Sequence, residues 1–220
     1  DQIQRQAMVR SNFERYFAPN VAAEIAAQQG TVKLGGDKRP VTILFSDIRG
    51  FTTMSEHMLP DEIAGLLSDY FTEMVDVIFS HGGTLDKFIG DAIMALWGAP
   101  IPHADDPDRA VQAAIQMQKA IQALNVKFKA DGRPTVSVGI GINYGETFAG
   151  NIGSHLRLEY TVIGDAVNVA SRLCSNAAGG DILISDSLYQ MLKEKPEVEA
   201  REPLSVKNRA QAVKVWRVKL

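Results

Sequence analysis

The stretch Val41-Thr42-Ile43-Leu44-Phe45-Ser46-Asp47 decides the predicted fold. Residues 41–46 form a compact apolar run rich in β-branched side chains, which is typical of a strand buried in a sheet. Asp47 lies at the carboxyl end of that strand. A carboxylate in this place either caps the following turn or belongs to a functional site at the edge of the sheet.

The segments downstream are predicted by the same spacing rules. They comprise a helix over 60–81, a hairpin of strands 84–89 and 93–97 around Gly90-Asp91, a helix over 106–129 and a strand over 136–143. Further C-terminal elements are a shorter strand near Thr147, a strand over 160–163, a helix from a cap at Asp165 through Ala177, strands over 182–184 and 213–218, and a short helix near Leu188.

This order of elements predicts an α+β fold with a ferredoxin-like βαββαβ core and additional C-terminal strands and helices. In that topology the first strand lies antiparallel beside the third. The end of the first strand and the start of the third therefore meet at one edge of the sheet. Asp47 and Asp91 occupy those two places, so we expect their carboxylates to lie close together.

The first 30 residues show a different pattern of apolar side chains from the rest of the chain. Residues 1–28 show helical apolar spacing that Pro19-Asn20 interrupts, and residues 30–40 are predicted as a loop. The chain does not begin with Met and starts in a helical pattern. We therefore interpret residues 1–30 as an N-terminal helical lead-in from a longer protein, and residues 31–220 as one domain.

Composition excludes several classes of protein. With 45% hydrophobic and 22% charged residues among 220, the chain is an ordinary globular sequence. A net charge of −3 argues against a nucleic-acid partner. The single Cys174 can form neither an internal disulfide nor a thiolate metal cage, which fits a reducing compartment. No apolar run reaches the roughly 20 residues that span a bilayer, so we expect no membrane segment in this fragment and a cytoplasmic location.

Two converging carboxylates are what a two-metal phosphoryl-transfer site requires. Mg²⁺ takes few protein carboxylates and leaves its other positions to water and substrate phosphates. The alternative is that Asp47 caps a turn and Asp91 serves the hairpin turn. In the loop Ile48–Thr53, Gly50 permits a tight turn, and backbone N–H groups after it could face phosphate oxygens.

Three stretches resemble the sequence signatures of class III adenylate and guanylate cyclases. They are FSDIRGFT at 45–52, DKFIGD at 86–91 and YTVIGDAVNVASRL at 160–173. The three occur in the order that the family has. The chain is thereby identified as similar to a class III nucleotidyl cyclase catalytic domain, which implies that fold for residues 31–220.

The resemblance implies a role for each matched residue. Asp47 and Asp91, with the Ile48 carbonyl, would bind two divalent metal ions, Mg²⁺ or Mn²⁺, per active site. The residues that would contact the substrate ATP are Gly50, Phe51, Thr52, Lys87, Thr161 and Lys207.

Asn168 and Arg172 are the catalytic residues that the resemblance implies. They are four positions apart on the predicted helix and so share one face. Their family roles are to position the ribose and to stabilise charge on the α-phosphate, for which Arg is suited by its permanent charge and forked donors. Without the resemblance, Arg172 would be interpreted as a solvated helix residue.

Lys87 and Thr161 match the pair that selects the purine. Adenine presents N1 as an acceptor and its 6-amino group as a donor, which a lysine and a hydroxyl complement. Guanine would call for a carboxylate in place of Lys87, so ATP is favoured over GTP. Thr161 resembles the subgroup that includes soluble, bicarbonate-responsive adenylate cyclases, which makes bicarbonate a candidate activator. The alternative is a strand threonine without a ligand.

In this family the active site lies between two domains arranged head to tail. This chain keeps both sets of residues, so the resemblance implies a homodimer that converts ATP to 3′,5′-cyclic AMP and pyrophosphate, with an upstream regulatory domain in the full-length protein. The competing hypotheses are a guanylate cyclase, a catalytically dead nucleotide-binding or dimerisation domain, and a plain ferredoxin-like interaction module. We expect the four histidines, at 57, 81, 103 and 155, to be ordinary surface residues.

Overall fold

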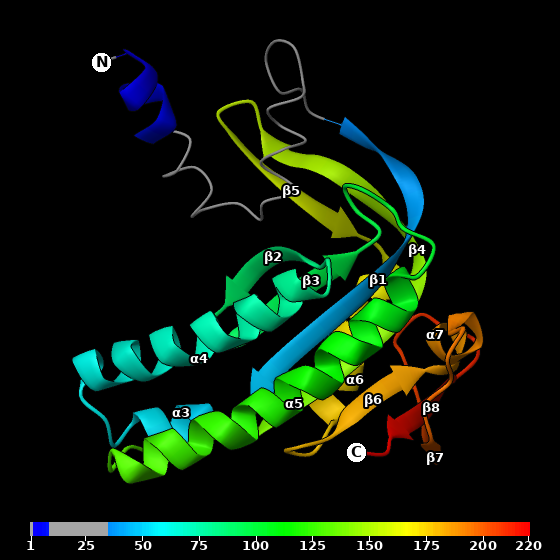
Figure 1. Ribbon diagram of the computed structural model, residues 1–220. Helices are drawn as coiled ribbons and strands as arrows, with labels where there is room; N and C mark the ends of the chain where they lie inside the picture. Colours follow the sequence, from blue (N-terminus) through cyan, green and yellow to red (C-terminus); the bar gives the residue numbers. More distant parts are fainter. Residues whose placement is uncertain (1, 9–34) are drawn as a thin grey trace.

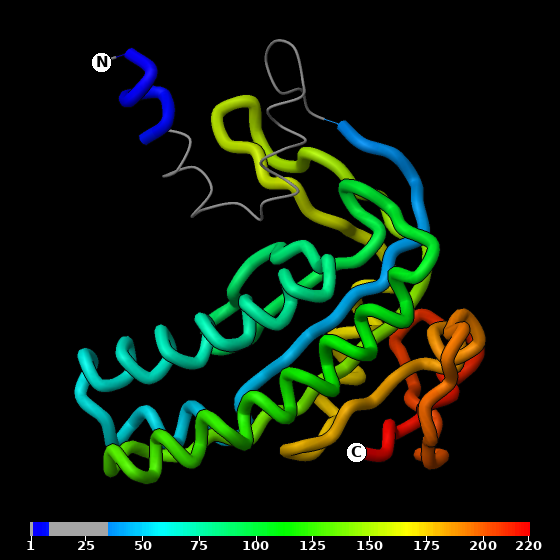
Figure 2. The backbone as a smooth tube through the Cα atoms, viewed as in Figure 1, coloured from blue at the N-terminus to red at the C-terminus, as the bar shows by residue number. Residues whose placement is uncertain are grey.

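The computed structural model describes residues 2–8 and 35–220, of which residues 2–8 are helical (Figures 1 and 2). The remainder of the predicted lead-in, with its break at Pro19-Asn20, lies outside the described residues. From residue 35 the elements are β1 (Gly35–Ile48), α3 (Phe51–Ser55), α4 (Pro60–Ser80), β2 (Thr84–Ile89), β3 (Ala92–Trp97), α5 (Asp106–Ala130), β4 (Val138–Ser154), β5 (Arg157–Ile163), α6 (Asp165–Asn176), β6 (Ile182–Ser185), α7 (Asp186–Met191), β7 (Val198–Leu204) and β8 (Val213–Val218).

The sheet contains the predicted ferredoxin-like core. Its strand order is β2-β3-β1-β4-β6-β8-β7, with β5 paired to β4 off this path. β1 is antiparallel to both β3 and β4, while β6 is parallel to β4. The fold class predicted from the order of elements, α+β with additions at the C-terminal end, is confirmed.

Helices cover both faces of the central strands. α4 and α5 lie side by side across one face, with α6 on the other (Figure 1). Leu44 belongs to the core cluster under α4 and α5, whereas Ile43 and Phe45 pack with the buried side chains of α6. Because both faces of β1 are buried over residues 41–46, this part of its sequence is a compact, mostly apolar run rather than an alternation.

The two long helices have the predicted bounds to within one residue. Pro60 is in the first turn of α4, where its missing N–H costs no hydrogen bond, and Gly82 adopts a φ of 74° after the last turn. In α5 the acidic residues Asp106 and Asp108 are in the first turn and Lys127 and Lys129 in the last, which suits the helix dipole.

The two longest strands differ from the prediction. β1 begins at Gly35, so the loop expected up to Pro40 is wrong, and its first residues pair with β4 at Glu146–Asn151. β4 is one strand of 17 residues rather than a strand, a turn and a second strand. Its glycines mark close packing instead of a turn, because a Cβ at Gly145 would lie 2.8 Å from the Ala166 Cβ of α6.

β4 is forked along its outer edge. Residues Ile140–Ile142 pair with β6, and residues Phe148–Ser154 pair with β5. Between the two regions the buried Asn143 donates to the Ala166 carbonyl oxygen of α6 at 2.9 Å. β4 therefore supports both β5, which carries Thr161, and α6, which carries Asn168 and Arg172.

Candidate active site

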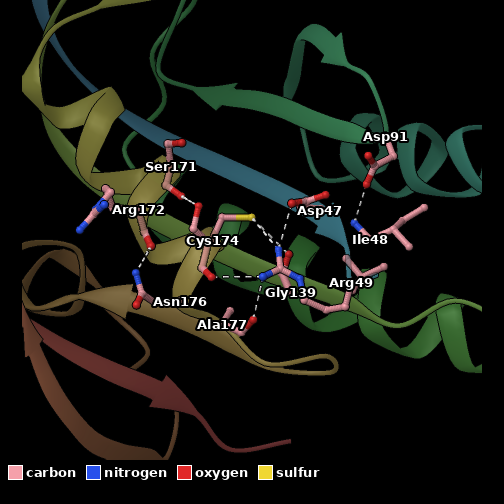
Figure 3. A network of polar contacts seen from close by, with 12 residues as sticks. Asp47, Ile48, Arg49, Asp91, Gly139, Ser171, Arg172, Cys174, Asn176 and Ala177 are labelled. Atoms are coloured by element: carbon pink, nitrogen blue, oxygen red, sulfur yellow. Dashed lines mark hydrogen bonds and ion pairs between the residues drawn. The ribbon is translucent and has the colours of Figure 1, made fainter. Parts of the chain in front are cut away.

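The carboxylates of Asp47 and Asp91 converge, as the topology predicts. Asp47 is the last residue but one of β1, and Asp91 follows Gly90, whose φ of 61° makes the tight turn between β2 and β3. The backbone N–H of Ile48 donates to Asp91 Oδ2 at 3.1 Å (Figure 3). Burial, a hydrogen bond with Asp91 and the charge of Asp91 raise the pKa of Asp47 to about 6.

This pair fits a site for hard divalent cations. Its donors are carboxylate oxygens with the Ile48 carbonyl beside them, and Mg²⁺ and Mn²⁺ prefer oxygen. Burial is the largest cause of the raised pKa of Asp47 and the charge of Asp91 adds to it, so bound cations would favour the ionised pair. Within residues 2–8 and 35–220 there is no group of three or more His, Cys, Asp or Glu side chains that could hold a metal ion.

Arg49 is a residue that the sequence analysis did not single out. Its guanidinium lies 3.2 Å from Asp47 Oδ2 and donates to the carbonyl oxygens of Ser175 and Ala177 at the end of α6 (Figure 3). The guanidinium of Arg49 thus connects the end of β1 to the end of α6. Only its place directly after Ser46-Asp47-Ile48 could have pointed to it in the sequence.

The loop after β1 enters a short helix that was not predicted. Gly50 has a φ of 66° and precedes α3, and an added Cβ there would meet nothing within 4 Å. Phe51 is partly buried against the core, whereas Thr52 is exposed. Of the loop residues expected at the substrate, Gly50 and Thr52 are therefore open to solvent, and Phe51 also supports the fold.

Lys87 and Thr161 are brought together by a third residue, Asp86. The Thr161 hydroxyl donates to Asp86 Oδ2 at 2.6 Å, and Lys87 Nζ lies 3.7 Å from Asp86 Oδ1. Lys87 Nζ also pairs with Glu159 Oε1 at 2.8 Å. Burial raises the pKa of Asp86 to about 6, against the hydrogen bond from Thr161, which lowers it. Asp86 begins the quoted stretch DKFIGD but had no predicted role, and Glu159 was not predicted as part of this group.

Asn168 and Lys207 line one surface cleft of ≈ 600 Å³. It lies between the start of α6 and the loop around Asn208, which has a positive φ of 69°. An ion pair of 2.8 Å between Arg209 and Asp165 holds that loop against the helix. Asp165 therefore does not cap α6 as expected. Gly164 is the N-cap residue, and the Asp165 carboxylate turns to the loop.

Arg172 lies on α6 with Asn168, and both are exposed. Its Nη2 is 3.4 Å from the Ser205 carbonyl oxygen, so the guanidinium faces the same loop that carries Lys207. In Figure 3 the Arg172 side chain points away from Asp47. The structure thus separates the two carboxylates from the exposed face of α6 within one chain.

The histidines play no part in this arrangement. His57, His103 and His155 are exposed, and His81 Nδ1 is 2.8 Å from the Val77 carbonyl oxygen of its own helix. In the described part of the chain no helix is long and apolar enough to cross a bilayer.

The fold and the site geometry together define a class of protein, the nucleotidyl cyclase domains of class III. A family model described as "Adenylate and Guanylate cyclase catalytic domain" matches residues 36–219. The chain belongs to this family.

Relatives of both substrate types are similar to the chain. An adenylate cyclase of Anabaena cylindrica is 41% identical over 94% of this chain and 43% of its own length. The crystal structure of the guanylyl cyclase Cya2 is 42% identical with a TM-score of 0.81, over 84% of this chain and 94% of that one. The adenylyl cyclase CyaB from P. aeruginosa is 35% identical with a TM-score of 0.81, over 84% and 96%. The chain thus spans less than half of the Anabaena protein.

Proposed function

We propose that this domain is an adenylate cyclase that converts ATP to 3′,5′-cyclic AMP and pyrophosphate. The observation that carries the proposal is the meeting of Lys87 and Thr161 on Asp86, because it places an ammonium donor and a hydroxyl oxygen side by side. These are the groups that complement N1 and the 6-amino group of adenine. The similarity to both adenylate and guanylate cyclases leaves the choice of base to these side chains.

The charge of Lys87 supports ATP over GTP. Burial lowers the pKa of this ammonium, but the hydrogen bond to Glu159 and the charge of Asp86 oppose burial, and the net shift is upward. Lys87 therefore remains a donor at neutral pH. A donor matches adenine N1 and opposes the N1–H of guanine, which would leave a desolvated polar group unpaired.

The remaining residues have roles in the reaction. Divalent ions held by Asp47, Asp91 and the Ile48 carbonyl would neutralise the triphosphate and acidify the ribose 3′-hydroxyl. Asn168 would orient the ribose, so that the 3′-oxygen faces the α-phosphorus in line with the leaving group. As the new O–P bond forms and the bond to pyrophosphate breaks, Arg172 would stabilise the charge on the α-phosphate and Lys207 would hold the triphosphate.

We infer that a complete site requires two copies of the chain. The metal carboxylates and the exposed face of α6 point in different directions within one chain, so a twofold dimer would bring one set from each copy into two equivalent sites. Apolar side chains on β2 and β5 support such an interface: Phe88, Ile89 and Ile163 are between 44% and 52% exposed.

The upstream segment and bicarbonate are proposed regulators. A lead-in over residues 1–30 would connect an upstream regulatory domain to the dimer. The resemblance of Thr161 to a bicarbonate-responsive subgroup supports bicarbonate as an activator. The domain would act in the cytoplasm, where ATP is supplied. Activity that does not change when bicarbonate is added at fixed pH would dismiss this activator.

One assay tests the proposed function. Purified protein is incubated with ATP or GTP in the presence of Mn²⁺ or Mg²⁺, and the cyclic nucleotide and pyrophosphate are quantified. We expect cyclic AMP and pyrophosphate in equal amounts, with ATP preferred when both nucleotides compete. A preference for cyclic GMP, or no cyclic product with either metal, would contradict the proposal.

A further inference from the structure

Asp86 is a fully buried carboxylate to which none of the proposed roles has been assigned. Its side chain has no exposed surface. Oδ2 accepts the hydroxyl proton of Thr161, while Oδ1 has no hydrogen-bond partner and faces Lys87 Nζ at 3.7 Å. A buried carboxylate with an unfilled oxygen costs stability, so it calls for a physical reason.

The contact with Asp86 fixes what Thr161 can offer to a ligand. A threonine hydroxyl has one proton and two lone pairs. In this structure the proton is committed to Asp86 Oδ2 at 2.6 Å. The oxygen therefore presents only lone pairs elsewhere, and Thr161 becomes an acceptor. An acceptor attracts the 6-amino group of adenine and repels a 6-oxo group.

The same carboxylate limits what Lys87 can offer. The ammonium has three protons and no lone pair. Two of its neighbours are carboxylates, Asp86 at 3.7 Å and Glu159 at 2.8 Å. The side chain is thus held on β2 beside Thr161, while a proton remains for the N1 atom of a purine.

We propose that Asp86 is a specificity-determining positioning residue that makes Thr161 an obligate acceptor and so selects a 6-amino purine over a 6-oxo purine. The inference rests on the proposed adenylate cyclase function and deepens it, since it assigns the selection to a residue that does not touch the base. Thr161 and Lys87 contact the base, and Asp86 sets the direction of their hydrogen bonds.

Asp86→Asn tests this inference because it reverses the polarity of the contact. The carboxamide oxygen would turn to the Lys87 ammonium, since a cation binds an oxygen and repels an NH₂ group. The NH₂ group would then donate to Thr161, whose proton becomes available to a ligand. Thr161 would change from an acceptor to a donor without any change in its own side chain.

The experiment compares kcat/KM for ATP and inosine triphosphate, which has a 6-oxo group and no 2-amino group. We expect wild type to prefer ATP, and Asp86→Asn to reduce the ratio of kcat/KM for ATP to that for inosine triphosphate by about tenfold, because the acceptor for the 6-amino group becomes a donor that faces it. Inosine also mismatches Lys87, but this mismatch is common to both proteins and cancels in the comparison. Asp69→Asn is the matched control, because it makes the same change from carboxylate to amide at an ion pair with Arg133, outside this group. Its ratio should stay within about twofold of wild type.

A double-mutant cycle separates positioning from a structural role. Thr161→Val removes the hydroxyl, so Asp86→Asn should have little further effect on the ratio in the Thr161→Val background. Asp86→Ser is a second variant in case the amide does not fold, and it should relax the ratio in the same direction. An unchanged ratio in both Asp86 variants, or additive effects in the cycle, would overturn the inference. Absence of any cyclic product from wild type would instead contradict the proposed function.

Discussion

Asp91 Oδ2 accepts a hydrogen bond from the backbone N–H of Ile48 at 3.1 Å, so the turn between β2 and β3 is fastened to the end of β1. One carboxylate oxygen of Asp91 therefore has a structural contact within the fold. Asp47 pairs with the Arg49 side chain, and burial beside Asp91 disfavours its charged form. The two acidic residues should therefore respond differently to substitution.

Replacing Asp47 or Asp91 with Ala should reduce cyclic AMP formation by at least about a hundredfold, because each removes a metal ligand from a charged transition state. Asp91→Ala should also lower the melting temperature, since it leaves the Ile48 N–H without its acceptor. Asp47→Ala should lower it less or not at all. Activity and thermal melts of the two variants, measured side by side, check both expectations.

Circular dichroism of each variant is the control for a folded domain. Substantial turnover by either folded variant would contradict the metal assignment. Equal losses of melting temperature in the two variants would show that the hydrogen bond from Ile48 to Asp91 does not stabilise the fold.

Mixing two inactive variants should restore activity. Asp47→Ala lacks a metal ligand, and Arg172→Ala lacks the proposed charge-stabilising residue, but a heterodimer contains one intact site. Random exchange of subunits gives half heterodimers with one of two sites intact, so activity should approach about a quarter of wild type. The measurement is cyclic AMP formation after the variants are mixed and allowed to exchange. A mixture of Asp47→Ala with Asp91→Ala is the matched control. It should stay inactive, because each copy lacks one of the two carboxylates and neither site of the heterodimer is complete.

Reversing the charge of Lys87 should require a second change. Lys87→Glu places a third carboxylate beside Asp86 and Glu159, so we expect a lower melting temperature as well as loss of ATP turnover. Adding Glu159→Lys restores an ion pair and should recover the melting temperature. ATP use should stay at least about tenfold below wild type in the double variant, because Glu cannot donate to adenine N1. Recovery of ATP turnover in the folded double variant would contradict the role of Lys87 at the base.

The stability of the metal-free domain should fall as the pH rises. The pKa of Asp47 is 3.8 in an unfolded chain and about 6 in the fold, because burial and the neighbouring Asp91 disfavour its charge. Between these values the folded state binds more protons, so a rise in pH lowers the free energy of unfolding. Asp47→Asn removes this term. The variant should gain melting temperature relative to wild type at pH 7.5 but not at pH 4.

Melts in a chelating buffer measure this difference, and melts with Mn²⁺ provide the control. The ion should stabilise wild type at pH 7.5 more than Asp47→Asn. An equal pH dependence of the two metal-free proteins would show that the charge of Asp47 carries no cost in the fold.

The core of the fold follows from local pattern, because its elements carry strong periodicity and clear stops. Residues 60–81 and 106–129 were predicted as helices, and α4 and α5 match them closely. The uninterrupted β4 could not be predicted, since Gly145 resembles a turn residue unless the approach of α6 is known. β7 was missed because its exposed, charged sequence lacks an apolar run.

The candidate site shows the same division. The convergence of Asp47 and Asp91 follows from topology alone, because antiparallel neighbours bring those two strand ends together. The contacts of Arg49 and Asp86 could not be predicted from the residue types and their spacing in the sequence. Asp86 depends on the contact of β5 with β2 across 75 residues of sequence, and Arg49 depends on the distant end of α6.

β4 supports both the residues proposed to select the base and the residues proposed for catalysis. β5, which carries Thr161, pairs with the C-terminal half of β4, and α6, which carries Asn168 and Arg172, packs on the middle of β4 at Asn143 and Gly145. A change of twist at the midpoint of β4 would shift both sets of residues together. The residues proposed for base recognition and those proposed for phosphate chemistry therefore rest on one strand. A regulator that changed the twist of this strand would alter both at once.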